Sequence, residues 1–430
     1  MLNMNNYKRE PYFHSVRLET ELCKGCTSCL KMCPTEAIRV RNGKAKIIKE
    51  RCIDCGECIR VCPSRAKIAV TNKLDGIDKF KYKIALPAPS FYGQFRNIKD
   101  VDIILTALKK IGFDDVFEVT LGAEVVTNIT LELLKSGKLK TPVINSACPA
   151  VLRLIQQRYP DLIENILPLR APVEIAAQIA KNKAIENNNF SFDEVGVFFI
   201  SPCAAKMTTV INPIGSEHSH IDGVLSMKDI VNELAPFIHK ITDIEITSAS
   251  TSHGIVWANN GGEIGALKEY NCISVDGIHN VYKILEDVED EKLNDIDFIE
   301  CSACVGGCVG GPLTVENSYV AKAKIRELSK KYSKNKSIIN NHTADVFLDK
   351  NIEETPLPQL GSNMQETITL IDKINSIYNT LPQLDCGSCG APSCNALAED
   401  IVRNFGKESD CIIKLKEKIR LISNEINELD

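Results

Sequence analysis

Two runs of cysteines have a spacing that suits metal chemistry. They begin at Cys23 and Cys52, and each reads C-x2-C-x2-C-x3-C followed by a proline. Thiolates spaced this closely can converge on one metal centre, whereas zinc sites use two pairs of ligands rather than two runs of four. A chain of 430 residues is also larger than the small secreted domains that depend on disulfides. The runs therefore predict iron, and zinc is the minor alternative.

The same spacing is similar to that of two-cluster bacterial ferredoxins. In those proteins the first three cysteines of each run bind one 4Fe-4S cluster and the fourth binds the other. The resemblance assigns one cluster to Cys23, Cys26, Cys29 and Cys62, and a second to Cys52, Cys55, Cys58 and Cys33. We expect an α+β ferredoxin-like domain over residues 16–78, after an N-terminal extension at 1–15. Its strands are predicted in SVRLET, AIRVRNGKAKII and AKIAV.

A third cysteine group lies near the C-terminus. Its pattern is C-x2-C-x4-C-x16-C, formed by Cys386, Cys389, Cys394 and Cys411. It resembles a small four-cysteine 4Fe-4S domain of electron-transfer and corrinoid-linked proteins, with zinc again the minor alternative. We expect a small α-helical domain over 379–430 in which a helix follows the cysteines at 395–404.

Apolar residues after Cys411 repeat at alternating spacings of three and four. They are Ile412, Leu415, Ile419, Ile422, Ile426 and Leu429. This pattern predicts an amphipathic helix, but it is shorter than the three to four heptads that indicate a coiled coil. The helix either packs on its own domain or forms a homodimer, and the sequence leaves both possibilities open.

The middle of the chain alternates apolar runs with helical patterns. We expect residues 79–378 to form an α/β domain of two lobes with mainly parallel sheets, and 313–378 to hold helices joined by a solvated linker. The strand-like runs are KIALPAP, DVFEVTLGA, TPVINSAC, VGVFFISPC, GIVWANN and DFIECSAC. Three of them end at Cys148, Cys203 and Cys304. Because the carboxyl ends of parallel strands line a ligand crevice, these thiols and Cys308 could meet there and hold another 4Fe-4S cluster.

The segments SACP (146–149), SPCAAK (201–206) and ECSACVGGCVGG (300–311) resemble the three signatures of iron-only (FeFe) hydrogenases. The resemblance implies an H-cluster, in which Cys148, Cys203, Cys304 and Cys308 hold a 4Fe-4S cube. Cys308 would bridge to a two-iron unit carrying CO, cyanide and a dithiolate amine. It further implies that Lys206 donates hydrogen bonds to a cyanide. Glycines at 306, 307, 310 and 311 would let the backbone approach the cluster. The implied activity is the interconversion of H2 with protons and electrons.

Several positions depart from the family pattern. Ala147 replaces the cysteine that passes protons to the bridging amine, and Ser201 and Ser302 replace methionines that flank the two-iron unit. Glu132 could match an outer relay glutamate. These departures resemble divergent hydrogenases of the sensory type, so we expect slow turnover or H2 sensing. The alternative is a non-catalytic hydrogenase-like protein for iron-sulfur assembly or electron relay. Cys301 and Glu300 could form a substitute proton route, and Cys272 fits no cluster and is expected to be a core thiol.

The amino-acid composition limits which classes of binding partner are expected. The chain is 44% hydrophobic and 25% charged, with a formal charge of -5, which favours a globular protein without a nucleic-acid footprint. No apolar run approaches the roughly 18 residues of a membrane span, and the N-terminus lacks a signal-peptide core. We expect a cytoplasmic protein that binds no membrane. The resemblance implies H2, protons, a soluble ferredoxin-type electron carrier or signalling partner, and hydrogenase maturation proteins.

Overall fold

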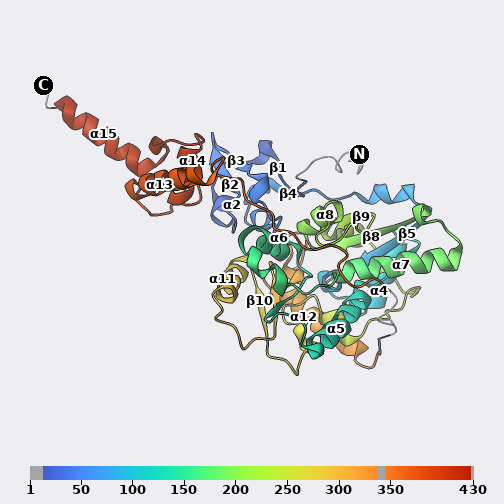
Figure 1. Ribbon diagram of the computed structural model, residues 1–430. Coiled ribbons are helices and arrows are strands. Elements are labelled where there is room, and N and C mark those ends of the chain that lie inside the picture. The colour runs from blue at the N-terminus through green and yellow to red at the C-terminus, as the bar shows by residue number, and fades with distance from the viewer. Residues whose placement is uncertain (1–12, 338–343, 428–430) are drawn as a thin grey trace. The chain divides into compact units, whose positions relative to one another are not determined.

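The computed structural model describes residues 13–337 and 344–427, and side chains as far as 424 (Figure 1). Contacts between Cα atoms divide the chain into two compact units. The larger unit comprises the described residues of 1–15, 53–56 and 69–355, and the smaller one those of 16–52, 57–68 and 356–430. The smaller unit therefore combines most of the ferredoxin-like segment with the C-terminal cysteine segment.

Two parallel sheets form the framework of the larger unit. One has the strand order β6-β5-β8-β9, and the other has the order β10-β11-β7. Every residue of β8 (Val195–Ser201) is buried, as expected for a strand covered on both faces, which reads in the sequence as one apolar run. The prediction of parallel sheets is thus confirmed. The other strands are β5 (Tyr82–Pro87), β6 (Asp115–Val116), β7 (Val143–Ile144), β9 (Gly223–Ser226), β10 (Cys272–Asp276) and β11 (Phe298–Ser302).

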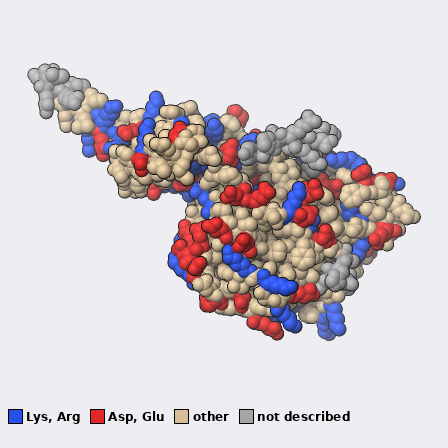
Figure 2. All heavy atoms as spheres, in the orientation of Figure 1, with Lys and Arg blue, Asp and Glu red and all other residues tan. Residues whose placement is uncertain are grey.

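Helices connect these strands and cover the sheets. They are α4 (Val101–Lys109), α5 (Val119–Ser136), α6 (Pro149–Arg158), α7 (Pro172–Asn188), α8 (Ala204–Ile211), α9 (Met227–Leu234), α10 (Ser252–Val256), α11 (Ile278–Glu289) and α12 (Ser318–Ser329). Helices α5 and α7 pack closely at Gly122, where a Cβ atom would lie 2.1 Å from the carbonyl oxygen of Pro172. Acidic and basic side chains are interspersed on the face shown in Figure 2.

One predicted strand was wrong. The run GIVWANN begins inside helix α10 and continues into a turn. The reason is local: the Thr251 side chain accepts a hydrogen bond from the backbone N–H of Gly254 at 3.2 Å and caps the helix. A short apolar run does not distinguish a strand from a buried helical turn.

The smaller unit contains short strands, short helices and the C-terminal helices. Its elements are β1 (Val16–Leu18), β2 (Ile38–Arg41), β3 (Lys44–Ile47), β4 (Lys67–Ala69, whose last residue belongs to the larger unit), α2 (Ser28–Lys31), α3 (Glu57–Arg60), α13 (Met364–Thr380), α14 (Cys394–Val402) and α15 (Ile412–Asn427). Ile374 of α13 shares a core with Leu397 of α14. Helix α13 therefore supplies part of the core around α14, and the domain boundary at residue 379 stays a prediction.

Helix α15 exposes the predicted apolar seam. Ile412, Leu415, Ile419 and Ile422 are between 40% and 56% exposed, while the side chains of Ile426 and Leu429 lie outside the described residues. Homodimerisation through this seam stays a prediction. Among the described helices, none combines the length and the apolar character that crossing a bilayer requires.

Candidate active site

Strand ends deliver the cysteines of the three signature segments. Cys148 follows β7 and Cys203 follows β8, and each is the residue at which the next helix, α6 or α8, begins. Cys304 follows β11, and Cys308 opens the 3-10 helix Cys308–Gly310. A helix N-terminus carries a partial positive charge, which favours a thiolate at that place.

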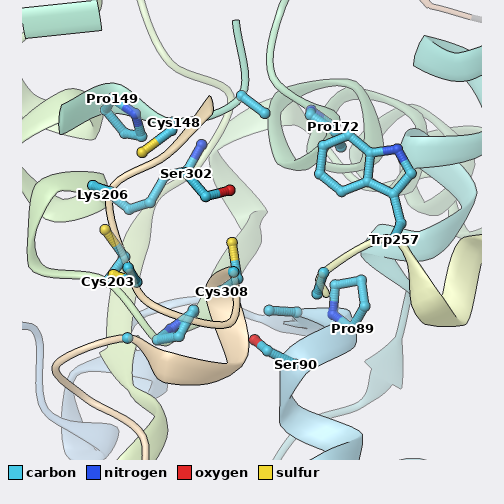
Figure 3. Close-up of a pocket in the computed structure, with 18 of the residues that line it drawn as sticks. Pro89, Ser90, Cys148, Pro149, Pro172, Cys203, Lys206, Trp257, Ser302 and Cys308 are labelled. Atoms are coloured by element: carbon cyan, nitrogen blue, oxygen red, sulfur yellow. The ribbon is translucent and has the colours of Figure 1, made fainter. Parts of the chain in front are cut away.

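All four thiols line one cavity of the larger unit. In Figure 3, Cys148, Cys203 and Cys308 lie on one side of this cavity and Trp257 lies on the other. The empty space, with its opening to solvent included, is about 930 Å³. The predicted convergence of four cysteines from three separate strand ends is therefore present in the structure.

Burial and mutual repulsion at these thiols favour the binding of a cation beside them. Burial raises the pKa of Cys308, and nearby Cys148, Cys304 and Cys203 raise it further, while Lys206 lowers it. Burial and the neighbouring Cys148 likewise raise the pKa of Cys203 to about 11. Four thiolates at such close quarters repel one another, so they ionise together only when metal compensates their charge. The donor set fits a 4Fe-4S cube, whose iron atoms are bound by four cysteine thiolates.

The glycines of the last signature lie close to neighbouring backbone. A Cβ at Gly310 would lie 2.0 Å from the Val305 carbonyl oxygen, and one at Gly311 would lie 2.2 Å from the Pro202 carbonyl oxygen. Gly307 has a φ of +87°, and its Cβ would lie 2.5 Å from the Asn260 nitrogen. These glycines therefore permit close packing of backbone on backbone, which positions the cysteine loop.

The other predicted site residues divide into two groups. Ala147, Lys206 and Ser302 line the cavity. Ser201 is buried and does not line it; its hydroxyl accepts from the Cys203 N–H and donates to the Cys203 carbonyl, both at 3.0 Å. Glu132 is exposed on α5 and does not line the cavity either. Neither residue is therefore placed to act at this cavity in the structure.

Polar residues that sequence reasoning missed also line the cavity. The Ser90 hydroxyl and the side-chain amide of Asn259 are buried and have no hydrogen-bond partner in the described part of the chain. Such groups normally find partners, so the cavity is suited to a ligand that accepts and donates hydrogen bonds. Diatomic ligands such as cyanide would accept from the Ser90 hydroxyl and the Asn259 amide nitrogen, whereas the Asn259 amide oxygen requires a separate donor. Ser90 could have been found from the sequence, because it follows strand β5 as the cysteines follow theirs.

A pair of buried carboxyl groups stands in the cavity wall. The Asn145 amide donates to Glu263 Oε2 at 2.8 Å, and backbone N–H groups of Gly261, Glu263 and Ile264 donate to Glu300 at 2.9–3.1 Å. Burial raises the pKa of Glu263 and of Glu300, and the charge of Glu300 raises that of Glu263 further. The charge of one carboxylate disfavours ionisation of the other. The three backbone donors favour the ionised form of Glu300, so the neutral form is favoured more at Glu263.

Cysteines of the smaller unit gather in two places. Cys23, Cys26, Cys29 and Cys62 line one cavity, and burial, together with the charges of Cys62, Cys26 and Cys23, raises the pKa of Cys29. Near the C-terminus, burial raises the pKa of Cys389, and the charges of Cys386 and Cys411 raise it further. Cys394 and Cys411 share one core. Both sets fit the cluster ligands that the spacing predicted. Cys55, one of the ligands assigned to the second ferredoxin cluster, belongs to the larger unit and lines its active-site cavity.

Comparison with protein families identifies the class of this chain. The family model described as "Iron only hydrogenase large subunit, C-terminal domain" matches residues 81–312, more than half of the chain. A 4Fe-4S dicluster domain matches residues 15–63, and an Fe-S cluster domain matches residues 381–413. The chain therefore belongs to the iron-only hydrogenase family.

Individual relatives are distant. The chain is 24% identical to iron hydrogenase 1 of Clostridium pasteurianum over 343 residues, which cover 66% of this chain and 58% of that protein. It is 25% identical to the large subunit of the periplasmic [Fe] hydrogenase of Nitratidesulfovibrio vulgaris, over 69% of this chain and 86% of that one. A solved structure of the [FeFe]-hydrogenase HydA1 from Chlamydomonas reinhardtii is 14% identical, with a TM-score of 0.46 over 64% of this chain and 95% of that one.

Replacing Cys203 tests the cluster assignment. We expect Cys203→Ser to lose about four iron atoms per chain, because a hydroxyl is a poor ligand for a 4Fe-4S cube. Iron analysis of anaerobically reconstituted protein measures this loss. Cys272→Ser is the matched control, since Cys272 only borders a core and its thiol donates to the Leu267 carbonyl at 3.7 Å. Equal iron in the two variants would contradict the assignment.

Proposed function

We propose that this protein interconverts H2 with two protons and two electrons at an H-cluster held by Cys148, Cys203, Cys304 and Cys308. The observation that carries the proposal is the presence of these four thiols in one cavity. When bound, the H-cluster would supply the electron-rich iron at which H2 is formed or cleaved. The four cysteines would hold its cube, and Cys308 would also join the cube to the two-iron unit.

Residues around the thiols would bind and orient the two-iron unit. Lys206 lines the cavity and supplies a positive charge close to Cys308. That charge would hold a cyanide in place, and the Ser90 hydroxyl and the Asn259 amide offer further hydrogen bonds. Apolar side chains such as Phe199 and Trp257 line the rest of the cavity and limit access of water.

Slow turnover follows from the residue at position 147. Ala147 lines the cavity where the family places a proton-relaying cysteine, and a methyl group neither donates nor accepts a proton. A protein that reacts with H2 slowly suits a sensory role, in which the redox state of the clusters reports the H2 level to a signalling partner.

A substitute proton route runs through the carboxyl pair. Glu263 and Glu300 both line the cavity, and their raised pKa values allow them to hold one proton near neutral pH. Glu263 is hydrogen-bonded to Asn145, whose Oδ1 accepts the Cys301 N–H at 2.9 Å. The pair would exchange its proton with the cavity and so replace the relay missing at Ala147.

Electrons would leave the cavity through the ferredoxin-type clusters. Cys55, an expected ligand of the second ferredoxin cluster, lines the cavity and so provides an exit for single electrons. A soluble ferredoxin-type carrier or a signalling partner would accept them, and maturation proteins would install the two-iron unit.

Infrared spectroscopy tests the proposed cofactor. Protein matured anaerobically with the two-iron unit should show CO and cyanide stretching bands, because polypeptide does not absorb in that window. Protein reconstituted with iron and sulfide alone is the control and should show none. The absence of bands after maturation, at full iron content, would support the non-catalytic assembly or relay role instead.

Substitution of Ala147 by cysteine tests the origin of slow turnover. We expect Ala147→Cys to raise the rate of H2 evolution by about 10-fold or more, because a relayed proton transfer contributes about 10²–10⁴ in rate. Ala147→Ser is the matched comparison, because it adds a hydroxyl group in place of the thiol that Ala147→Cys adds. The idea is wrong if the cysteine variant carries intact infrared bands and turns over no faster.

Amide variants test the carboxyl pair. We expect Glu263→Gln and Glu300→Gln each to slow H2 oxidation by about 10²-fold while leaving the infrared bands in place. In the unmodified protein the shared proton is lost as pH rises above neutral, so H2 evolution should fall there, and the amide variants should lose this pH dependence. Glu233→Gln, on the exposed surface of α9, is the control. Unchanged rates in both amide variants would exclude the route.

A further inference from the structure

The C-terminal cysteine loop rests directly on a strand of the ferredoxin-like segment. The Val40 N–H donates to the Gly390 carbonyl at 2.8 Å, and Arg41 Nη1 donates to the Cys389 carbonyl at 2.6 Å. Gly390 has a φ of +79°, and a Cβ there would lie 1.8 Å from the Val40 carbonyl oxygen. Only glycine therefore permits this approach of the two backbones. Figure 1 shows α13 and α14 beside β2 and β3.

Buried ion pairs hold the two modules together. Asp400 of α14 accepts from Arg39 Nε at 2.7 Å and from Arg41 Nη2 at 2.8 Å. The side chains of Arg39 and Asp400 are only 7% and 6% exposed. A second pair joins Arg51 to Glu399, the neighbour of Asp400. Charged groups buried to this degree persist only when they are paired, so the pairs fix one relative orientation of the modules.

The contact brings the terminal loop against the segment that carries Cys29. A Cβ at Gly387, between Cys386 and Cys389, would lie 3.3 Å from Leu30 Cδ2 and 2.8 Å from Lys31 Cε. Lys31 Nζ also donates to the Asp385 carbonyl at 2.6 Å. Leu30 directly follows Cys29, so this contact is made by the chain neighbour of an expected ligand of the first ferredoxin cluster.

We infer that the C-terminal cluster is the outer end of one electron relay, docked so that it exchanges electrons directly with the cluster of Cys23, Cys26, Cys29 and Cys62. Cys386, Cys389, Cys394 and Cys411 would hold the electron donor, and Cys23, Cys26, Cys29 and Cys62 would hold the acceptor. One electron would pass from the first group, which would be oxidised, to the second, which would be reduced, without transfer of a proton. The inference rests on the clusters of the proposed function, but not on the two-iron unit. Cys386 is exposed, so the terminal cluster is open to a one-electron carrier.

Electron paramagnetic resonance of the full chain tests this step. The protein is loaded with its 4Fe-4S clusters only and fully reduced with dithionite. A reduced terminal cluster next to the first ferredoxin cluster should broaden the resonance signal of the first ferredoxin cluster. It should also speed the electron-spin relaxation of that cluster. We expect Cys411→Ser, which removes the terminal cluster, to narrow that signal and to make it saturate at lower microwave power.

Variants of the docking contact test whether the signal depends on the closeness of the two clusters rather than on the number of clusters bound. Asp400→Asn removes the charge that Arg39 and Arg41 share, and Gly390→Ala blocks the approach to Val40. We expect either variant to narrow the signal as Cys411→Ser does while retaining full iron content. Glu417→Gln, on α15 and paired with Lys414 within that helix, is the matched control and should leave the signal unchanged.

The outcomes distinguish this inference from the proposed function. The inference is overturned if Cys411→Ser leaves the signal of the first cluster unchanged, or if both docking variants keep their iron and the broadened signal. Missing infrared bands after maturation would instead overturn the proposed function. They would leave the relay intact, because its test uses protein without the two-iron unit.

Discussion

The site depends on one constraint, which is that the carboxyl ends of two separate parallel sheets open into the same cavity. β7 and β11 belong to one sheet and deliver Cys148, Cys304 and Cys308, while β8 belongs to the other and delivers Cys203. The backbone at Pro202 joins them: its carbonyl accepts the Leu313 N–H at 3.1 Å, and Gly311 packs against it without room for a Cβ. This contact ties the third signature to the second. Because it is made between backbones, side chains elsewhere in the loop can vary without moving the thiols.

The cavity wall contains polar groups whose burial is unfavourable. A buried donor or acceptor without a partner costs about 1–3 kcal/mol, and the Ser90 hydroxyl and the Asn259 amide find none within the described part of the chain. Burial also raises the pKa of the Cys308 thiol and of the Glu263–Glu300 pair. A bound group that supplied positive charge to the thiols and hydrogen-bonding atoms to the amide and hydroxyl would offset these unfavourable terms.

Much of this site was accessible from sequence because its strands are buried on both faces and end in cysteine. An apolar run followed by a thiol is visible without a structure, and three of them converge. The predictions that failed required knowledge of which side chains of a helix or loop face the interior. Glu132 and Glu124 lie on the same helix, α5, yet Glu124 is buried and Glu132 is exposed, and the sequence pattern did not separate them. Glu263 lies in an irregular segment without periodicity, and its partner Glu300 is on a distant strand. The sequence also did not show which core helix α13 covers, and Ile374 of this helix packs with Leu397 of α14.

The buried ion pairs of the smaller unit are better explained by the orientation that they impose than by a gain in folding stability. A buried pair often gains no more free energy than apolar side chains of the same volume, whereas removing one partner costs about 3–5 kcal/mol. Asp400 with Arg39 and Arg41 is therefore better explained by orientation: the carboxylate fits the two guanidinium groups in one geometry only. Apolar packing tolerates small rotations, and electron transfer does not, because its rate falls steeply with distance. Gly390 also fixes the relative position of the two modules, because a Cβ there would push its backbone away from the backbone of Val40.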